Sequence, residues 1–301
     1  MLAGHFNIIM TPTITAKIIQ DSIAYGTRLT TFELEYPRFI HAELMTHRVF
    51  SRNSASSRAI PVERMLQFIE TTPACPLHWG QNQSGMQADQ EVEDSHNAKE
   101  IWQTARDMAC TQARLMLLEG IHKQVANRLT EPFQTMKVVV TATEWRNWYE
   151  LRNHQDAQPE IRELAHQMQL EHASSQPLEL QPGDWHVPYV DRVKINSQIH
   201  YEAAGERCDR TQARMVSASC CAQVSYRRLD QSLEKALQIA QRLVSGRPWH
   251  ASPFEHQARP LHSLLPTETW EAGVTHRDRH GNLWSGNFRN WIQHRQLLEA
   301  V

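Results

Sequence analysis

Arginine and hydroxyl side chains gather in residues 41–61, HAELMTHRVFSRNSASSRAIP, which we call the arginine segment. Arg48, Arg52 and Arg58 are spread through it, together with four serines and one asparagine. A guanidinium group is a planar fork of N–H donors and hydroxyl groups add neutral donors, so the combination suits phosphate. Serine and asparagine side chains also bond readily to nearby backbone. The segment therefore predicts an anion-binding loop, with a self-bonded structural loop as the alternative.

The arginine segment is expected to begin as a helix and to end as a polar loop. Nothing in residues 40–48 breaks a helix, whereas the serines and the asparagine that follow compete with the backbone for hydrogen bonds. Pro37 ends the preceding strand and starts this helix. The helix would therefore deliver the arginine side chains to one place.

The rest of the chain alternates between predicted strands and helices. Two strands within residues 14–36 flank a turn at Gly26, and their alternating side chains indicate an antiparallel pair. The other predicted elements are helices over residues 62–70, 91–119, 122–129, 144–152, 159–172, 213–224 and 231–244, strands over residues 135–141 and at the end of 245–261, and loops over residues 71–90 and 176–190.

The longest predicted helix carries apolar side chains at helical spacing. They are Ile101, Ala105, Met108, Leu115 and Leu118. Such a stripe is typical of a helix face that packs on the core, which is the role we expect for it.

Composition excludes several classes of protein. The chain has 301 residues, of which 41% are hydrophobic and 21% charged, as in an ordinary globular protein. With 31 basic and 33 acidic residues, the net charge of −2 argues against general nucleic-acid or membrane-surface binding. No apolar run approaches the roughly 18 residues that span a bilayer. We expect small-molecule partners, no nucleic acid and no membrane.

Cysteine usage indicates a reducing compartment. The five cysteines, Cys75, Cys110, Cys208, Cys220 and Cys221, are odd in number and two are adjacent, unlike a disulfide framework. No CxxC pair supports a zinc site, so no metal is expected. The N-terminus lacks the basic region of a signal peptide, and its apolar part is too short for one. We expect a cytoplasmic protein.

The arginine segment resembles the signature of the flavin-dependent thymidylate synthases, the thymidylate synthase complementing proteins. That signature reads R-H-R, two residues, S, one residue, N, two residues, S, one residue, R. The matching residues are His47, Arg48, Ser51, Asn53, Ser56 and Arg58, and the departure is Thr46 in place of the first arginine.

A second block surrounds Arg152. From its residues alone, an arginine at the C-terminal end of a helix either faces a cleft or stabilises the helix through its dipole. The pattern LR, four residues, AQ, one residue, EI resembles the family block whose arginine contacts the pyrimidine ring. Residues 119–129 are similar to the segment whose arginine, here Arg128, reaches the phosphate of a neighbouring subunit's nucleotide. The chain departs at Asp156, where the family usually has His, and near Thr141 and Thr143, where it has Asn and Arg.

Two further blocks resemble the family but occur in a different order. Residues 222–226, AQVSY, and 250–256, HASPFEH, are similar to segments that precede the arginine signature in the family and follow it here. The resemblance therefore implies a circularly permuted member. A permutation is tolerated when the original termini lie close together at the surface. We expect residues 1–301 to form a single flavin- and nucleotide-binding domain, with the blocks after residue 222 packed near the arginine segment.

The resemblance implies a fold, an assembly and a reaction. The fold would be α/β, an antiparallel sheet flanked by long helices, in a homotetramer with flavin sites between subunits. The chain would be an FAD-dependent methyltransferase that converts dUMP to dTMP with methylenetetrahydrofolate and NADPH. Arg152 would be catalytic, and the nucleotide would contact Glu43, Ser54, Ser56, Arg58, Arg128 and Arg152. The flavin would contact His47, Arg48, Asn147, Ser225, His250, Ser252 and Glu255.

Altered positions in these blocks keep two other functions open. Glu43 stands where the family commonly has Gln, and its carboxylate should repel phosphate unless Arg52 or Arg58 pairs with it. Together with Thr46, Ser54 and Asp156, it leaves room for flavin- and folate-dependent hydroxymethylation, or another modification, of a uracil or cytosine nucleotide. The other alternative is a non-catalytic nucleotide-binding module.

Overall fold

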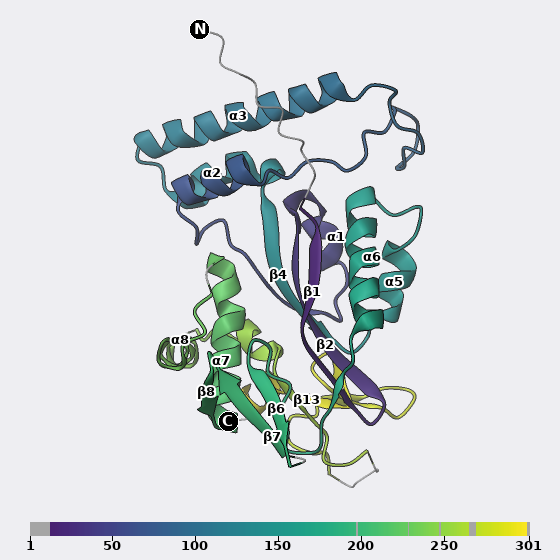
Figure 1. Ribbon diagram of the computed structural model, residues 1–301, viewed down its shortest axis with the longest axis vertical. Helices are drawn as coiled ribbons and strands as arrows, with labels where there is room; N and C mark the ends of the chain where they lie inside the picture. Colours follow the sequence, from purple (N-terminus) through teal and green to yellow (C-terminus); the bar gives the residue numbers. More distant parts are fainter. Residues whose placement is uncertain (1–12, 197, 228, 247, 265–268, 300–301) are drawn as a thin grey trace.

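A five-stranded sheet lies at the centre of the fold (Figure 1). The computed structural model describes residues 13–196, 198–227, 229–246, 248–264 and 269–299. The strand order is β3-β4-β2-β1-β5, with β1 (Thr15–Ala24), β2 (Thr27–Pro37), β3 (Ser51–Ser54), β4 (Thr135–Ala142) and β5 (Leu178–Glu179). The pairs β1–β2, β2–β4 and β3–β4 are antiparallel, and β5 runs parallel to β1. The predicted pair around Gly26, whose φ is +70°, and the predicted α/β class are confirmed.

One face of the sheet holds an aromatic core. Phe32, Leu34 and Tyr36 of β2 are fully buried there. This face is covered by α1 (His41–Met45), which follows the 3₁₀ turn η1 (Arg38–Ile40), by α5 (Arg146–Arg152) and by α6 (Pro159–Ser174). The predicted helices over 144–152 and 159–172 are confirmed, and Trp145 and Trp148 bring α5 onto the sheet.

The other face of the sheet packs against later parts of the chain. Val139 of β4 lies against Cys221 and Val224, from α7 (Arg210–Gln223) and η3 (Val224–Tyr226). Helix α8 (Leu233–Ser245) lies against α7, and both helices were expected. The sequence reading missed a small antiparallel sheet of β6 (Asp191–Ile195), β7 (Gln198–Ala203) and β8 (Glu206–Cys208).

The last part of the chain folds back toward the central sheet. Strand β9 (Ala258–Pro260), which follows η4 (Ser252–Glu255), pairs with β13 (Trp291–Gln293). Between them, β10 (His276–Arg277), β11 (Leu283–Ser285) and β12 (Phe288–Arg289) form a second small sheet, and α9 (His294–Glu299) follows. The strand expected at the end of 245–261 is therefore β9.

Helix α3 (His96–Leu118) lies along one end of the molecule, beside α2 (Val62–Thr71) (Figure 1). Cys110 and Ala113 of α3 pack on α2 and on the segment formed by α4 (Lys123–Ala126) and η2 (Asn127–Phe133). The stripe expected in the core is instead exposed: Ile101 is 69%, Met108 62%, Leu115 48% and Leu118 82% accessible. That prediction was wrong because α3 carries apolar side chains on two faces, and the face with Trp102, Cys110 and Ala113 packs inward.

The arginine segment is more regular than predicted. Residues 41–45 are helical as expected, but residues 51–54 form the edge strand β3 instead of a loop. Ser51 pairs with Thr141 and Ser54 with Val138 of β4. The sheet satisfies the backbone here, so the serine side chains do not have to. Among the described residues, no helix is long and apolar enough to cross a bilayer.

Candidate functional site

Arg152 is the centre of a polar cluster between α5 and α1. It lies in the last turn of α5, and its three guanidinium nitrogens each donate a hydrogen bond to a residue of the arginine segment. Nε donates to Nε2 of His47 at 3.1 Å, Nη1 to Oε2 of Glu43 at 2.8 Å, and Nη2 to Oγ1 of Thr46 at 3.2 Å. Three of its five N–H donors are used in the described chain, so two remain for a ligand.

His47 is buried and neutral. Its ring packs beside Phe50 and edge-on to Trp148. Burial, together with the neighbouring positive charges of Arg152 and Arg52, lowers its pKa from 6.5 to about 4. Because Nε2 accepts from Arg152, the proton of the neutral ring must be on Nδ1. His47 therefore orients the guanidinium without adding positive charge.

Glu43 pairs with Arg152, and neither Arg52 nor Arg58, the two arginines that could have offset its charge, pairs with it in the described chain. Arg52 instead donates from Nη1 to the carbonyl oxygens of Met45 at 3.2 Å and His47 at 2.9 Å. It therefore caps the end of α1 and is not available to balance the carboxylate. Glu43 and Arg152 together present an acceptor and a donor side by side.

These two residues line a cavity of about 1260 Å³. Its other walls are residues 155–160, after α5, and the loop at residues 76–89. Two hydrogen bonds hold this loop: the backbone N–H of Leu77 donates to Oε1 of Glu160 at 2.7 Å, and Gln87 Nε2 donates to the carbonyl of Asp156 at 3.0 Å. The 71–90 loop, which had no assigned role, thus closes one side of the candidate site.

The residues predicted to hold phosphate lie at the other end of β3. Arg58 is exposed, and within the described chain its guanidinium has no acceptor. The turn that carries it is held by Asn127, whose Nδ2 donates to the carbonyls of Ser57 at 2.7 Å and Ile60 at 3.0 Å. Arg128, next along the chain, is exposed and pairs with Glu131 at 2.9 Å.

The predicted nucleotide-binding residues therefore form two groups in one chain. Glu43 and Arg152 lie near the end of β3 where the strand begins. Ser56, Arg58 and the segment of Arg128 lie near the end where it finishes. A strand advances about 3.3 Å per residue, so β3 alone separates the groups by about 10 Å. Ser54 is the last residue of β3. The two groups therefore lie near opposite ends of β3.

The blocks after residue 222 do lie against the arginine segment, as expected. The backbone N–H of Ser56 donates to the carbonyl of Ser225 at 3.0 Å. Arg227 pairs with Glu35 of β2. Glu255 is bound twice by the end of the chain, because Gln293 Nε2 donates to its carbonyl at 3.0 Å and Arg295 pairs with its carboxylate.

The other predicted flavin-binding residues lie at the surface. Arg48, Asn147, His250 and Ser252 are exposed, and Ser225 is half-buried. In the described chain Arg48 has no hydrogen-bond acceptor, so its charge is available to a ligand. These residues carry the donors that phosphate groups need.

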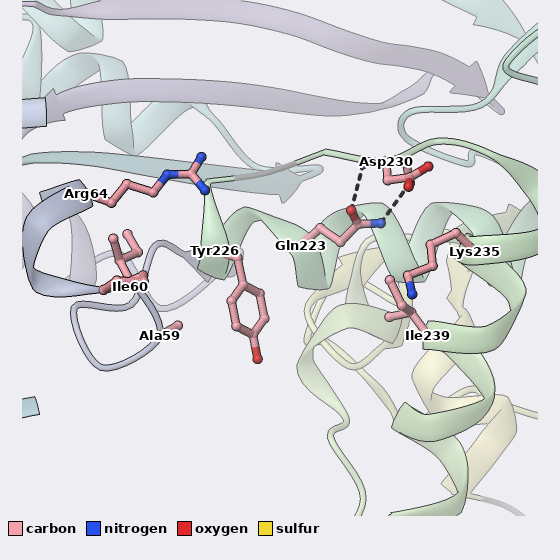
Figure 2. Close-up of a pocket in the computed structure, with 9 residues that line it drawn as sticks. Ala59, Ile60, Arg64, Gln223, Tyr226, Asp230, Lys235 and Ile239 are labelled. Carbon is pink, nitrogen blue, oxygen red and sulfur yellow. Dashed lines mark hydrogen bonds between the residues drawn. The ribbon is translucent and has the colours of Figure 1, made fainter. Parts of the chain in front are cut away.

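A smaller cavity, of about 380 Å³, lies where the arginine segment meets α7 and α8 (Figure 2). Ala59, Ile60 and Tyr226 face it, and Gln223 on its wall is held by the backbone of Asp230. Two of its lining residues, Ala59 and Tyr226, directly follow Arg58 and Ser225 in the sequence. It is thus a neighbour of both predicted binding blocks.

Sequence reading missed the polar residues of the chain's end that support the site. Gln293 is 2% exposed, and its Nε2 also donates to Ser51 Oγ at 3.1 Å and Asn287 Oδ1 at 3.0 Å. The polar and aromatic composition of residues 275–295 was the only signal. In the described residues, no three His, Cys, Asp or Glu side chains gather to hold a metal ion. All five cysteines are described, and none forms a disulfide.

The sequence model of the family "thymidylate synthase complementing protein" matches residues 28–177. Through this segment the chain belongs to that family. The match spans the arginine segment, Arg128 and Arg152, which carried the resemblance, so the family prediction is confirmed. The blocks at 222–226 and 250–256 lie outside the matched range, and the permutation stays a prediction.

Solved structures of another protein are also similar. Two crystal structures of a UMP/dUMP methylase PolB from Streptomyces cacaoi, bound with 5-Br dUMP and 5-Br UMP, align with 16% and 18% sequence identity. Each has a TM-score of 0.43 and covers 56% of this chain, and 92% and 91% of the respective methylase chains. No curated protein matches the chain significantly. The family assignment rests on the segment match alone.

Proposed function

We propose that the chain is a pyrimidine-nucleotide-modifying enzyme of the thymidylate synthase type, which converts dUMP to dTMP. Membership of the family supports it, and the observation that carries it is Arg152. This guanidinium keeps two N–H donors beside a neutral histidine, at the wall of a cavity of about 1260 Å³. The proposed substrates are dUMP, methylenetetrahydrofolate and NADPH.

The exposed donors fit an FAD cofactor. Arg48, His250 and Ser252 offer a guanidinium, an imidazole and a hydroxyl at the surface, a donor set suited to a dinucleotide's phosphates. His47, Asn147, Ser225 and Glu255 complete the proposed flavin set. When bound, FAD would carry the hydride from NADPH and take part in moving the one-carbon unit. The protein's share is binding, orientation and electrostatics.

Each arginine has a distinct proposed role. Arg152 donates to a pyrimidine carbonyl and stabilises the negative charge that grows on the ring during reaction. Arg58, with Ser56 and Arg128, binds the nucleotide phosphate, whose charge does not change. We further propose a homotetramer whose nucleotide and flavin sites lie between subunits, as the family resemblance implies.

Incubation with dUMP, labelled methylenetetrahydrofolate, FAD and NADPH tests the function directly. We expect labelled dTMP, and purified protein that is yellow or takes up FAD. Protein that stays colourless with added FAD, yet binds dUMP, would favour a nucleotide-binding module without catalysis. Protein that binds neither would refute both.

A second function is favoured by Glu43, whose carboxylate lies 2.8 Å from Arg152 in the cavity. A carboxylate accepts readily from an amino group but repels a carbonyl oxygen, so it could change the base or the product. Running the same assay with dCMP, and identifying methyl or hydroxymethyl product by mass, separates this hydroxymethylation reading from thymidylate synthesis.

A further inference from the structure

The C-terminal hairpin, residues 283–293, lies across the ends of β3 and β4. Asn287 Nδ2 donates to the carbonyl of Val49 at 2.9 Å, and the backbone N–H of Arg289 donates to Thr143 Oγ1 at 3.2 Å. The β3–β4 register pairs Ser51 with Thr141, so the continuing chains bring Val49 and Thr143 alongside each other. The hairpin therefore bridges the arginine segment and the start of α5.

Arg289 is only partly neutralised by the protein. Its Nε donates to Glu144 Oε1 at 2.6 Å, and its side chain is 32% exposed. Within the described chain neither Nη group has an acceptor, so four N–H donors remain. This is the arrangement of a guanidinium that is held in place and ready to bind an anion.

Arg48 and Asn147 stand next to the same contacts. Arg48 directly precedes Val49, which the hairpin binds, and Asn147 lies three residues after Glu144 at the start of α5. Both side chains are exposed. The segments that carry these two guanidinium groups and this amide thus meet at the same ends of β3 and β4, where positive charge favours an anionic partner.

Buried contacts fix the hairpin in this position. Gln293 bonds to Ser51, Asn287 and the carbonyl of Glu255. Gly286, with φ of +58°, lies so close that an added Cβ would stand 2.6 Å from Gln293 Oε1. Gln293 and Asn287 are positioning residues, since they act through the residues they hold.

We propose that Arg289 binds the flavin cofactor together with Arg48, at an anionic or carbonyl edge of that cofactor. This inference rests on the proposed function, because it takes flavin as the ligand. The shared chemistry is a hydrogen-bond acceptor for a guanidinium, supplied either by the phosphates or by the ring carbonyls. The hairpin, which lies outside the family match, would then be part of the binding site.

The test compares FAD affinity of the whole protein with that of Arg289→Ala and Arg289→Gln. The glutamine side chain keeps a donor for Glu144, so the Arg289→Gln variant should still fold. The midpoint of thermal unfolding checks that both variants are folded. Arg146→Ala is the matched control, because Arg146 is an exposed arginine of α5 that pairs with Glu150. Both Arg289 variants should raise the Kd for FAD roughly tenfold or more, as loss of a charge-assisted bond does. The control should leave it unchanged.

Riboflavin, FMN and FAD, measured in parallel, distinguish the two acceptors. If Arg289 contacts phosphate, the variants weaken FMN or FAD but not riboflavin; if it contacts the ring, all three weaken alike. A folded variant that binds every flavin as tightly as the wild type overturns the inference and leaves the proposed function standing. Wild-type protein that binds no flavin overturns both.

Discussion

At the scale of residues, Arg152 and Arg58 are both potential anion binders, but their surroundings differ. Arg152 is oriented by Glu43, Thr46 and His47, with its guanidinium fixed before a ligand arrives. Arg58 is exposed on a turn. Preorganised donors are what stabilise charge that develops in a transition state, whereas an exposed cation mainly contributes binding.

Loss of these two arginines should therefore affect different kinetic constants. Arg58→Ala should weaken nucleotide binding by about 1.5–3 kcal/mol and chiefly raise KM, because phosphate is bound equally in ground and transition states. Arg152→Ala should lower turnover roughly a hundredfold or more with flavin still bound. Lysine should rescue neither fully, since one ammonium cannot reproduce the planar fork.

Single-turnover rates, nucleotide affinity and flavin content check this for each variant, with Arg146→Ala as the control. If Arg152→Ala kept near-normal turnover at saturating nucleotide, its catalytic role would be ruled out. The phosphate role of Arg58 could still hold.

Acid should destabilise the protein through His47. Its pKa of about 4 in the folded chain lies below the ordinary 6.5, so between these values the unfolded state binds more protons. The contribution is fully present above pH 6.5 and is lost as the pH falls toward about 4. Urea unfolding across this range should show a smaller loss of stability for His47→Gln than for the wild type. Equal losses would contradict the burial of a neutral ring.

At the scale of elements, the turn that carries Arg58 depends on the segment formed by α4 and η2. Asn127 is fully buried and holds the Ser57 and Ile60 carbonyls, and Lys123 Nζ donates to the carbonyl of Ala59 at 3.0 Å. The segment of Arg128, expected from a neighbouring subunit, thus braces Arg58 within its own chain.

Asn127→Ala should destabilise the fold by about 1–3 kcal/mol, because it leaves two buried carbonyls without donors. Nucleotide affinity should fall as well, since Arg58 loses its support. Denaturant unfolding and nucleotide titration measure the two effects. A variant with lower stability but unchanged affinity would show that this turn does not bind phosphate.

At the scale of the whole molecule, the stripe on α3 is the largest departure from expectation. Ile101, Met108 and Leu115 recur every seven residues and are exposed on α3. This helix lies along one end of the molecule (Figure 1). Exposed apolar surface of this kind marks interaction sites. A second copy of the chain is the partner that the proposed homotetramer supplies.

Met108→Glu should shift the assembly toward smaller species, because the charge would be buried at the centre of that contact. Light scattering after size-exclusion chromatography measures the mass, with Gln241→Glu, at an exposed position of α8, as the control. An unchanged mass for the α3 variant would exclude this face from the interface.

The C-terminal third should not be separable from the rest. Arg227 pairs with Glu35 of β2, and Gln293 donates to Ser51 of β3. Trp291 donates to the carbonyl of Thr27. A chain ending at residue 205 should therefore lose solubility or flavin binding. If it stayed folded and bound flavin, the proposal of a single permuted unit would be wrong.

The sequence by itself determined the family, the central antiparallel pair and most helices. Those features depend on local signals: fixed spacing around Arg152 and His47, period-two alternation beside Gly26, and helical periodicity. Tertiary structure decided which faces are buried, because packing selects among apolar faces, as on α3. Tertiary structure also decided the partner of Glu43 and the contacts of Gln293. Charged groups and amides bond to the groups that the fold brings near them, and such a neighbour can be more than 200 positions away in the chain, as Ser51 is from Gln293.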